Sequence, residues 1–267
     1  INKKKNYFAE LSIRLFDEER FGFSYKQKDV FLEGSIKHEN YAKVNKITFS
    51  KIKISNLIEA RAEYTNFSDH KEFKIKNAAV ALAYLKKFKF KKRKKPLDII
   101  FDKVVLKSNS KIILENVKGE IRVYNGIRGY ANSVNEKNSE ASLTFTPKKN
   151  NLTEILISSN NAGKFLKKSQ FYQNGDGGSI QINLLYKNKD NIEGKFKIND
   201  FSVRKAPVLA QLISAASIIG LLDALNGTGL LFTQIEGKFS YKNNILQLSD
   251  GIAIGPSIGL TMSGLKS

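Results

Sequence analysis

The residue types that most often carry chemistry are scarce in this chain. Among its 267 residues there is no Cys, and the two His residues are His38 and His70. The lack of Cys excludes disulfides, thiolate metal sites and cysteine nucleophiles. Each His stands in a polar stretch without a second metal ligand at a useful spacing, so we expect two exposed histidines and no metal site.

The other candidate groups are a glycine-rich segment and scattered carboxylates. The segment NGDGG at 174–178 lacks the Lys-Ser/Thr end of a phosphate loop and precedes a predicted strand, so it predicts a hairpin turn. Asp98, Asp102, Asp200 and Asp250 fall near predicted strand ends or turns, where Asp side chains bond to nearby backbone groups. Because no spacing nominates an acid–base pair or a nucleophile, we expect neither an enzyme nor a bound cofactor.

The strongest chemical signal is positive charge. Lys and Arg total 45 against 25 Asp and Glu, which gives a net charge of +20. Such a balance predicts attraction to polyanions, meaning nucleic acid or anionic lipid headgroups. Lys, Asn and Ile are abundant together, as in proteins from AT-rich genomes, so codon bias is the alternative explanation of the charge.

The charge peaks in KKFKFKKRKK at 86–95, where eight of ten residues are basic and Phe88 and Phe90 alternate with Lys. Basic residues interleaved with aromatics suit single-stranded nucleic acid or anionic headgroups. The alternative is a solvated strand end and loop before Pro96. The candidate contacts to an anionic surface are Lys89, Lys91, Lys92, Arg93, Lys94 and Lys95.

The elements that must position these groups are predicted to be strands. Apolar and polar residues alternate in most of the chain, as in LSIRLF from 11 and SIQINLLY from 179, and Gly, Asn, Asp or Lys bound each run. We count roughly fifteen to eighteen strands, most joined by short turns that make neighbours antiparallel. The resulting sheet has one apolar face, which a sandwich, a barrel or a bound ligand must cover.

One apolar stretch breaks this pattern, at 207–232. Pro207 suits the first turn of a helix, and Asn226 with Gly227 gives a stop, so we predict a helix over 207–226. A helix of about 18 residues is about 27 Å long, which is marginal for a bilayer core of about 30 Å. A strand pattern resumes at Leu230, which favours a helix packed on the sheet over a membrane span.

The same stretch resembles the C-terminal region of the AsmA-like family, in its YhdP-type branch. The phrases concerned are APVLAQLISAASIIGLLDALNGTGLLF at 206–232 and GPSIGLTMSG at 255–264. The segments PLDIIFDKVVL from 96 and LISSNNAGKFLKKSQFYQNGDGGSIQI from 156 are also similar to it, with Asn161 where the family often has Asp. The resemblance covers residues 96–267 well and 1–95 only by general pattern.

The resemblance implies a long curved antiparallel sheet, an open groove or taco-like fold, with the apolar helix near 207–226. It implies a periplasmic carrier of phospholipids between the inner and outer membrane, anchored in the inner membrane by a segment that the chain lacks. In this reading residues 1–95 are the N-terminal part of the groove and 96–267 its AsmA-like C-terminal part. Phospholipids and the two membranes are the expected partners, and nucleic acid is not.

The residues expected to line the groove follow from the strand alternation. They are Ile112, Leu114, Ile121, Val123, Leu143, Phe145, Ile155, Ile157, Ile180, Ile182, Leu184, Phe196 and Ile198. Those expected to make the helix an end cap are Leu209, Leu212, Ile213, Ala216, Ile219 and Leu222. Two other classes stay open: a scaffold or regulator of outer-membrane assembly that holds no lipid, and a basic nucleic-acid-binding β protein.

Overall fold

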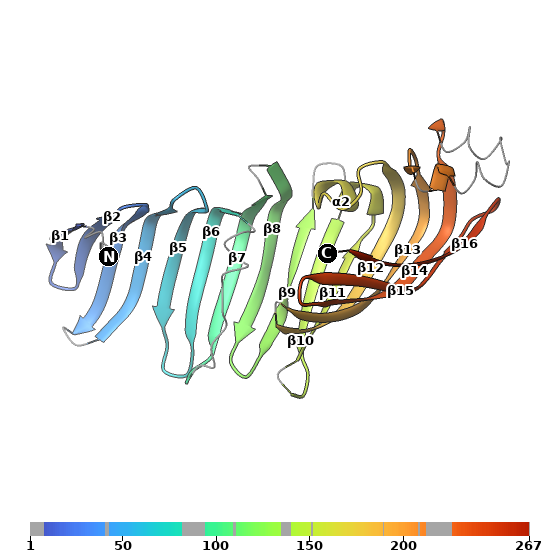
Figure 1. Cartoon of the computed structure of the whole chain (residues 1–267). Helices are drawn as coiled ribbons and strands as arrows, with labels where there is room; N and C mark the ends of the chain where they lie inside the picture. Colours follow the sequence, from blue (N-terminus) through green and yellow to red (C-terminus); the bar gives the residue numbers. More distant parts are fainter. Residues whose placement is uncertain are drawn as a thin grey trace, which may run out of the picture. The chain divides into compact units, whose positions relative to one another are not determined.

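The chain forms one open sheet of 16 strands that follow one another in sequence order (Figure 1). The structure is a computed structural model that describes residues 8–40, 43–81, 94–108, 111–134, 140–150, 152–188, 190–207, 209–211 and 226–266. The predicted fold class, mainly β with a single long open sheet, is confirmed. The chain divides into two compact units, Ile1–Ala131 and Asn132–Ser267, called the N-terminal and C-terminal units.

The described part of the N-terminal unit consists of strands. The strands are β1 (Ala9–Asp17), β2 (Arg20–Gln27), β3 (Val30–Asn40), β4 (Lys43–Ile54), β5 (Ile58–Asn66), β6 (Lys71–Ala81), β7 (Leu97–Ser108), β8 (Lys111–Val123) and the start of β9 (Ile127–Val134). Residues 1–95, for which only a general strand pattern was apparent, thus contribute β1 to β6 to the same sheet. The boundary between the two compact units lies in β9, between Ala131 and Asn132.

One pair of neighbouring strands departs from the antiparallel pattern. Strands β6 and β7 are parallel, with Lys71 opposite Leu97 and Ala81 opposite Lys107. Parallel neighbours need a connection of about a dozen residues or more to bring the chain back to the same end of the sheet. The basic segment 82–96 provides that length, and a short turn at this point would have forced an antiparallel pair.

The register of the N-terminal unit aligns its apolar side chains in rows that cross the strands. One row comprises Leu15, Phe21, Ile36, Ile47, Tyr64, Phe73, Ile99 and Ile121. The next comprises Ile13, Phe23, Gly34, Phe49, Ala62, Ile75, Phe101 and Gly119. Because side chains alternate between the two faces of a strand, these rows share one face. The buried residues around them are small, namely Ala60, Ala78, Val104 and Val117.

The C-terminal unit repeats this design and adds a short helix. Its elements are the end of β9, then β10 (Glu140–Pro147), β11 (Thr153–Ser159), α2 (Ala162–Lys168), β12 (Gly175–Asn188), β13 (Asn191–Val203), β14 (Leu230–Lys242), β15 (Ile245–Ile254) and β16 (Gly259–Lys266). One apolar row comprises Leu143, Ile157, Ile182, Phe196 and Gly237. The next comprises Phe145, Ile155, Leu184, Gly194, Phe239 and Leu248.

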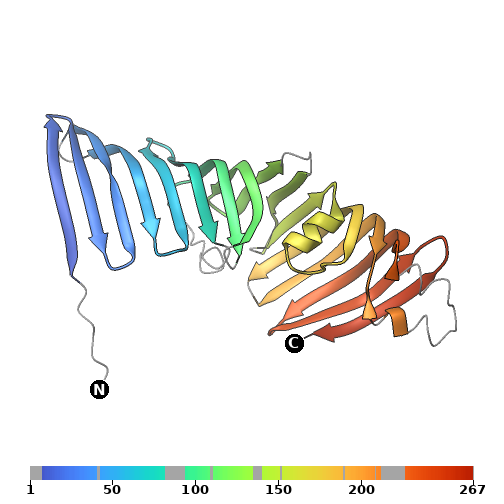
Figure 2. The ribbon, with the colours of Figure 1, turned by 90° about the horizontal axis from the view of Figure 1, so that it is seen from above.

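The helix α2 was not predicted, because a single helix was expected from the sequence, over 207–226. Asn161 caps its first turn, since the Asn161 side-chain oxygen accepts from the Lys164 backbone N–H at 2.9 Å. Ala162 and Leu166, spaced i and i+4, pack with Ile180 and Phe201 of β12 and β13. Figure 2 shows the helix lying against the strands of the C-terminal unit. The spacing of one helix turn in AGKFL was the signal for this amphipathic helix.

Glycines let phenyl rings lie close to the sheet on the apolar face of the C-terminal unit. Gly194 lies directly opposite Phe239, and a Cβ at Gly194 would stand 2.7 Å from the Phe239 Cζ and 2.8 Å from the Asn183 carbonyl oxygen. Gly237 lies opposite Phe196 in the neighbouring row, where a Cβ would come within 3.1 Å of the Phe196 ring. Each ring therefore occupies the space that a larger opposite residue would fill.

We expect Gly194→Ala to lower the free energy of unfolding by about 1–3 kcal/mol, because the new methyl group overpacks against Phe239 and the Asn183 carbonyl. Gly264→Ala in β16 is the matched control, because a Cβ there meets no atom within 4 Å. It should be neutral or stabilise by about 0.5 kcal/mol, through the lower entropy of the unfolded chain. Urea titrations of the three proteins give both values, and equal stability of the two variants would contradict the packing argument.

Candidate functional site

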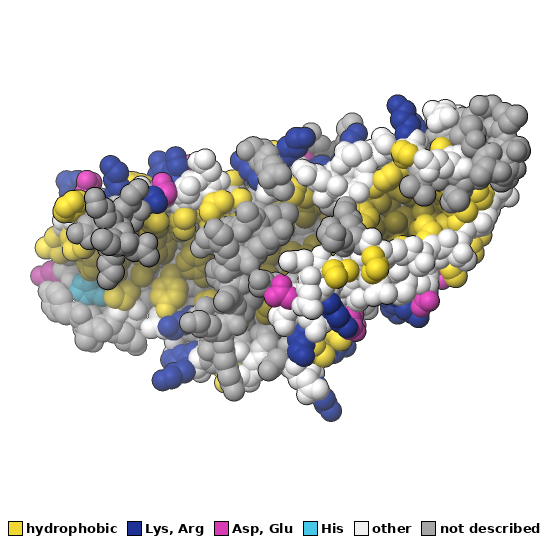
Figure 3. All heavy atoms as spheres, viewed as in Figure 1, with side chains coloured by type: hydrophobic (Ala, Val, Ile, Leu, Met, Phe, Trp, Pro, Cys, Tyr) yellow, Lys and Arg dark blue, Asp and Glu magenta, His cyan; other side chains and the backbone are white. Residues whose placement is uncertain are grey.

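The candidate site is a face of the sheet. We call "the apolar face" the side of each unit that carries the rows described above. The side chains of the row from Leu143 to Phe196 are half-buried, shielded by their neighbours in the sheet. At the edge strand β1 the exposure rises to 63% for Leu11, 66% for Ile13 and 74% for Leu15. Figure 3 shows hydrophobic side chains gathered in hollowed areas over the strands, with Lys and Arg along the borders.

Most of the residues predicted to line a groove lie half-buried on this face. They are Leu114, Ile121, Leu143, Phe145, Ile155, Ile157, Ile182, Leu184 and Phe196. Within the C-terminal unit the register brings Leu143, Ile157 and Ile182 into one row and Phe145, Ile155 and Leu184 into the next. An apolar surface built from such rows can hold hydrocarbon, since each methylene removed from water gains about 0.8 kcal/mol.

Four of the predicted lining residues are not half-buried. Val123 is only 2% exposed, and Ile180 and Ile198 are buried in the cluster beneath α2, so these three side chains belong to the core. Ile112 is 49% exposed near the start of β8, next to a register irregularity. Strand alternation assigns a residue to a face, but it does not show which part of that face a helix covers.

The predicted end-cap helix is described only at its two ends. Residues 207, 209–211 and 226 are helical, and the Ala210 N–H donates to the Ala206 carbonyl at 2.8 Å. Leu209 and Ala210 pack against Leu230, Phe232 and Ala253, at the C-terminal strands. The other predicted cap residues, Leu212, Ile213, Ala216, Ile219 and Leu222, lie outside the described residues. Of the helices in the described part of the chain, none is long and apolar enough to cross a membrane.

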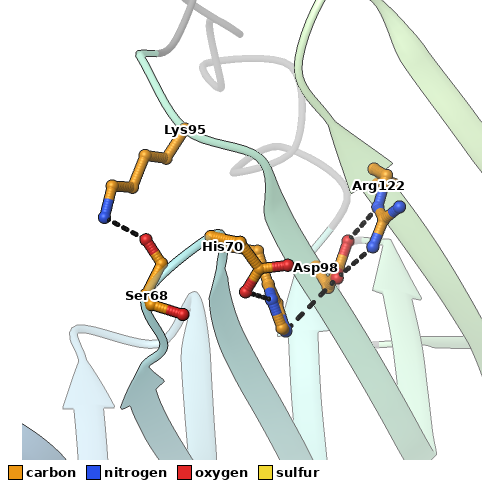
Figure 4. Close-up of polar contacts among 6 residues, drawn as sticks. Ser68, His70, Lys95, Asp98 and Arg122 are labelled. Carbon is orange, nitrogen blue, oxygen red and sulfur yellow. Dashed lines mark hydrogen bonds and ion pairs between the residues drawn. The ribbon is translucent and has the colours of Figure 1, made fainter.

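The predicted basic contact segment is also described only in part, because Lys89, Lys91, Lys92 and Arg93 lie outside the described residues. Lys94 and Lys95 are exposed. The Lys95 ammonium donates to the Ser68 carbonyl at 2.6 Å, which ties the approach to β7 to the turn before β6 (Figure 4). Lys95 therefore has a structural contact at the end of the connection between the two parallel strands.

A polar cluster next to that contact holds the start of β7. Asp98, with a side chain only 8% exposed, accepts two hydrogen bonds from the Arg122 guanidinium, at 2.6 and 2.7 Å (Figure 4). The His70 ring lies 3.8 Å from the Asp98 carboxylate and stacks on Phe67. The hydrogen bonds from Arg122 outweigh desolvation and hold the pKa of Asp98 below its ordinary value. The near-complete pairing indicates a structural role for Asp98.

The histidines differ from the sequence expectation. His38 is buried, with 8% exposure, and lies beside Phe21 with a ring-centroid distance of 6.2 Å, so the expectation that it is exposed is wrong. The His70 side chain is 24% exposed. His38 follows Ile36 by two residues in β3, so strand alternation places its side chain on the apolar face, beside Phe21. The described residues contain no group of three His, Cys, Asp or Glu that could hold a metal ion.

The face opposite the apolar face carries the paired charges. In the N-terminal unit Glu63 accepts from Lys46 at 3.1 Å and lies 3.5 Å from Lys76, and the Lys46 contact lowers the pKa of Glu63. In the C-terminal unit Lys195 and Lys197 are exposed and point away from the row that contains Phe196. The paired charges thus lie on the side opposite the apolar rows.

We expect the contribution of Asp98 to stability to vanish in acid. Its pKa is lowered in the folded chain, so the ionised carboxylate stabilises the fold above the unfolded-state pKa of about 3.9. This contribution decreases as the pH falls through the folded-state pKa. In urea titrations from neutral pH to pH about 2, Asp98→Asn should therefore be less stable than the parent at neutral pH and converge with it in acid. A gap that is constant with pH would contradict this assignment.

Comparisons with known proteins add nothing to this geometry. No protein-family model, no curated protein and no solved structure matches the chain at a significant level.

Proposed function

We propose that the chain is a bridge-like carrier that moves phospholipids between the inner and outer membranes of a cell envelope along its apolar face. The observation that carries the proposal is the apolar face itself. Its rows of Leu, Ile, Phe and Tyr continue from strand to strand within each unit, yet most of their side chains are only half-buried. A surface of this kind needs an apolar occupant, and acyl chains fit a shallow surface without directional polar groups.

The two rows of the C-terminal unit carry no polar side chain, which suits transport rather than tight binding. Members of the row from Phe145 to Leu248 are Phe, Ile, Leu and Gly, so an acyl chain meets similar contacts at each strand. A lipid that moves by one strand, about 4.8 Å, exchanges methylene contacts of about 0.8 kcal/mol each for equivalent ones. The barrier between neighbouring positions is then low, and diffusion along the face needs no bound nucleotide.

The resemblance to the AsmA-like family supports the same proposal, and it also suggests the periplasm, with attachment to the inner membrane, as the location. An envelope scaffold that holds no lipid remains the rival proposal, because it would use the same sheet for protein contacts. Nucleic acid is less favoured. The exposed Lys195 and Lys197 have no described aromatic between them on their face, whereas single-stranded nucleic acid binding combines cations with aromatic stacking platforms.

We expect phospholipid to co-purify with the chain. The double variant Ile155→Gln/Leu184→Gln should hold about one fifth of that amount or less. The two residues are register partners on the apolar face, and each change removes methylene contacts from the lipid and adds an amide that the lipid cannot satisfy. Lipid extraction and native mass spectrometry give the amount bound per chain.

The matched control is Leu156→Gln/Leu185→Gln, which makes the same chemical change on the same two strands but on the opposite face. It should leave the bound lipid unchanged, and thermal melting checks that both variants are folded. If the purified parent chain holds no lipid, or if both double variants lose it equally, the apolar face is not the carrier and the scaffold proposal gains.

A further inference from the structure

One corner of the C-terminal unit presents an exposed aromatic side chain that the backbone holds in place. Phe171, three residues beyond α2, is 75% exposed. Its backbone N–H donates to the Leu166 carbonyl at 3.0 Å, and the Leu166 side chain is buried between the helix and the sheet. The preceding residue, Gln170, has a positive φ of 62°, a conformation that costs energy for a non-glycine residue. The turn therefore directs the phenyl ring to the outside.

The same corner is basic. The segment 161–175 contains Lys164, Lys167 and Lys168 and no acidic residue. Arg204 and Lys205 lie at the end of β13 and are exposed. The nearest acid in sequence, Asp176, is 3.3 Å from the Arg204 guanidinium, so its charge is offset within the corner. The local balance is strongly positive around an exposed ring.

Hydrogen bonds join the two parts of this corner into one surface. The Tyr172 hydroxyl donates to the Arg204 carbonyl at 2.7 Å, and the Arg204 N–H donates to the Asn174 carbonyl at 2.9 Å. The Gln173 amide donates to the Lys167 carbonyl at 3.2 Å. We call "the α2 corner" the surface formed by α2, residues 169–174, Arg204 and Lys205. Pro207, which starts the apolar helix, follows Lys205 by two residues.

We propose that the α2 corner docks on the surface of an anionic lipid bilayer. A phenyl ring is favourable at the boundary between headgroups and acyl chains, and cations around it attract an anionic leaflet. A segment with a fixed aromatic, several lysines and no unpaired acid has both properties. Its position at the ends of β12 and β13, beside the start of the apolar helix, would bring one border of the apolar face to the bilayer.

The first test measures binding to vesicles of phosphatidylglycerol and phosphatidylethanolamine by co-sedimentation, with vesicles of phosphatidylcholine alone as the neutral comparison. The variant Lys164→Gln/Lys167→Gln/Lys205→Gln should bind the anionic vesicles at least about tenfold more weakly, since each cation at the surface accounts for roughly a fivefold factor. The whole chain is basic, with a net charge of +20, so a control of equal charge is needed.

That control is Lys187→Gln/Lys195→Gln/Lys197→Gln, which removes three exposed lysines from the charged face of the same unit. It should weaken binding by less than about threefold, because these cations are not at the docking surface. If the two triple variants weaken binding equally, the attraction is spread over the chain and the α2 corner is not a docking site.

A second test follows the ring itself. The chain has no Trp, so Phe171→Trp provides a single indole reporter. Its fluorescence should shift to the blue and be quenched by brominated lipids when anionic vesicles are added. Leu265→Trp is the control, because Leu265 is 73% exposed but belongs to the end of β16, where Lys266 pairs with Leu246. Unchanged emission from the Phe171→Trp chain on bound vesicles would overturn the proposal.

The docking proposal stands apart from lipid carriage. Lipid that co-purifies with the chain reports on the apolar face, whereas vesicle binding reports on the α2 corner. A chain that holds lipid but fails both vesicle tests retains the carrier function and loses this docking site. A chain without bound lipid that passes them is a membrane-attached scaffold.

Discussion

The structure depends on the two-residue period of its strands. Alternation places every second side chain on one face, and the register carries that face from strand to strand, as from Tyr64 to Phe73 and from Ile157 to Ile182. A sheet made in this way must remove its apolar side from water. In the described part of the chain the covering elements are α2 and the start of the helix at Pro207, both in the C-terminal unit. The remaining apolar side chains shield one another only in part.

Packing within the single layer explains how the apolar face remains shallow. In a two-layered fold a large ring points into the opposite layer, whereas here it must lie against its own sheet. Gly194 under Phe239 and Gly237 beside Phe196 give the rings that space. The N-terminal unit reaches a similar result with small buried residues, such as Ala60 and Ala78. The face is therefore kept smooth by small residues placed opposite large ones.

The sequence allowed the strands and their faces to be predicted, because alternation in runs such as TEILISS and SIQINLLY depends only on geometry. It did not reveal which side chains a helix would cover. Ile180 and Ile182 have the same pattern, yet Ile180 is buried beneath α2 and Ile182 lies at its border. The parallel pair β6 and β7 was also missed. The segment 82–96 is long enough for a parallel connection, but a loop of that length can also join antiparallel strands, so length alone does not decide the pairing.

The burial of His38 and the exposure of Phe171 were missed for different reasons. The residues around His38 are polar, but alternation from Ile36 places its side chain on the apolar face. Phe171 follows Gln170, whose positive φ belongs to a turn that no sequence pattern indicated. The turn before Phe171 has an energetic cost, and yet it leaves the phenyl ring exposed to water.

The charge distribution complements the apolar face. Acids in the described residues tend to pair with lysines on the charged side, as Glu193 does with Lys242 at 2.7 Å and Asp250 with Lys238 at 2.9 Å. The surplus of cations then remains distributed over that side and the borders. Like charge opposes the association of two exposed apolar faces, since bringing two such chains together also brings their cations together. An anionic lipid encounters no such repulsion, so the same surplus favours lipid over a second copy as the occupant of the face.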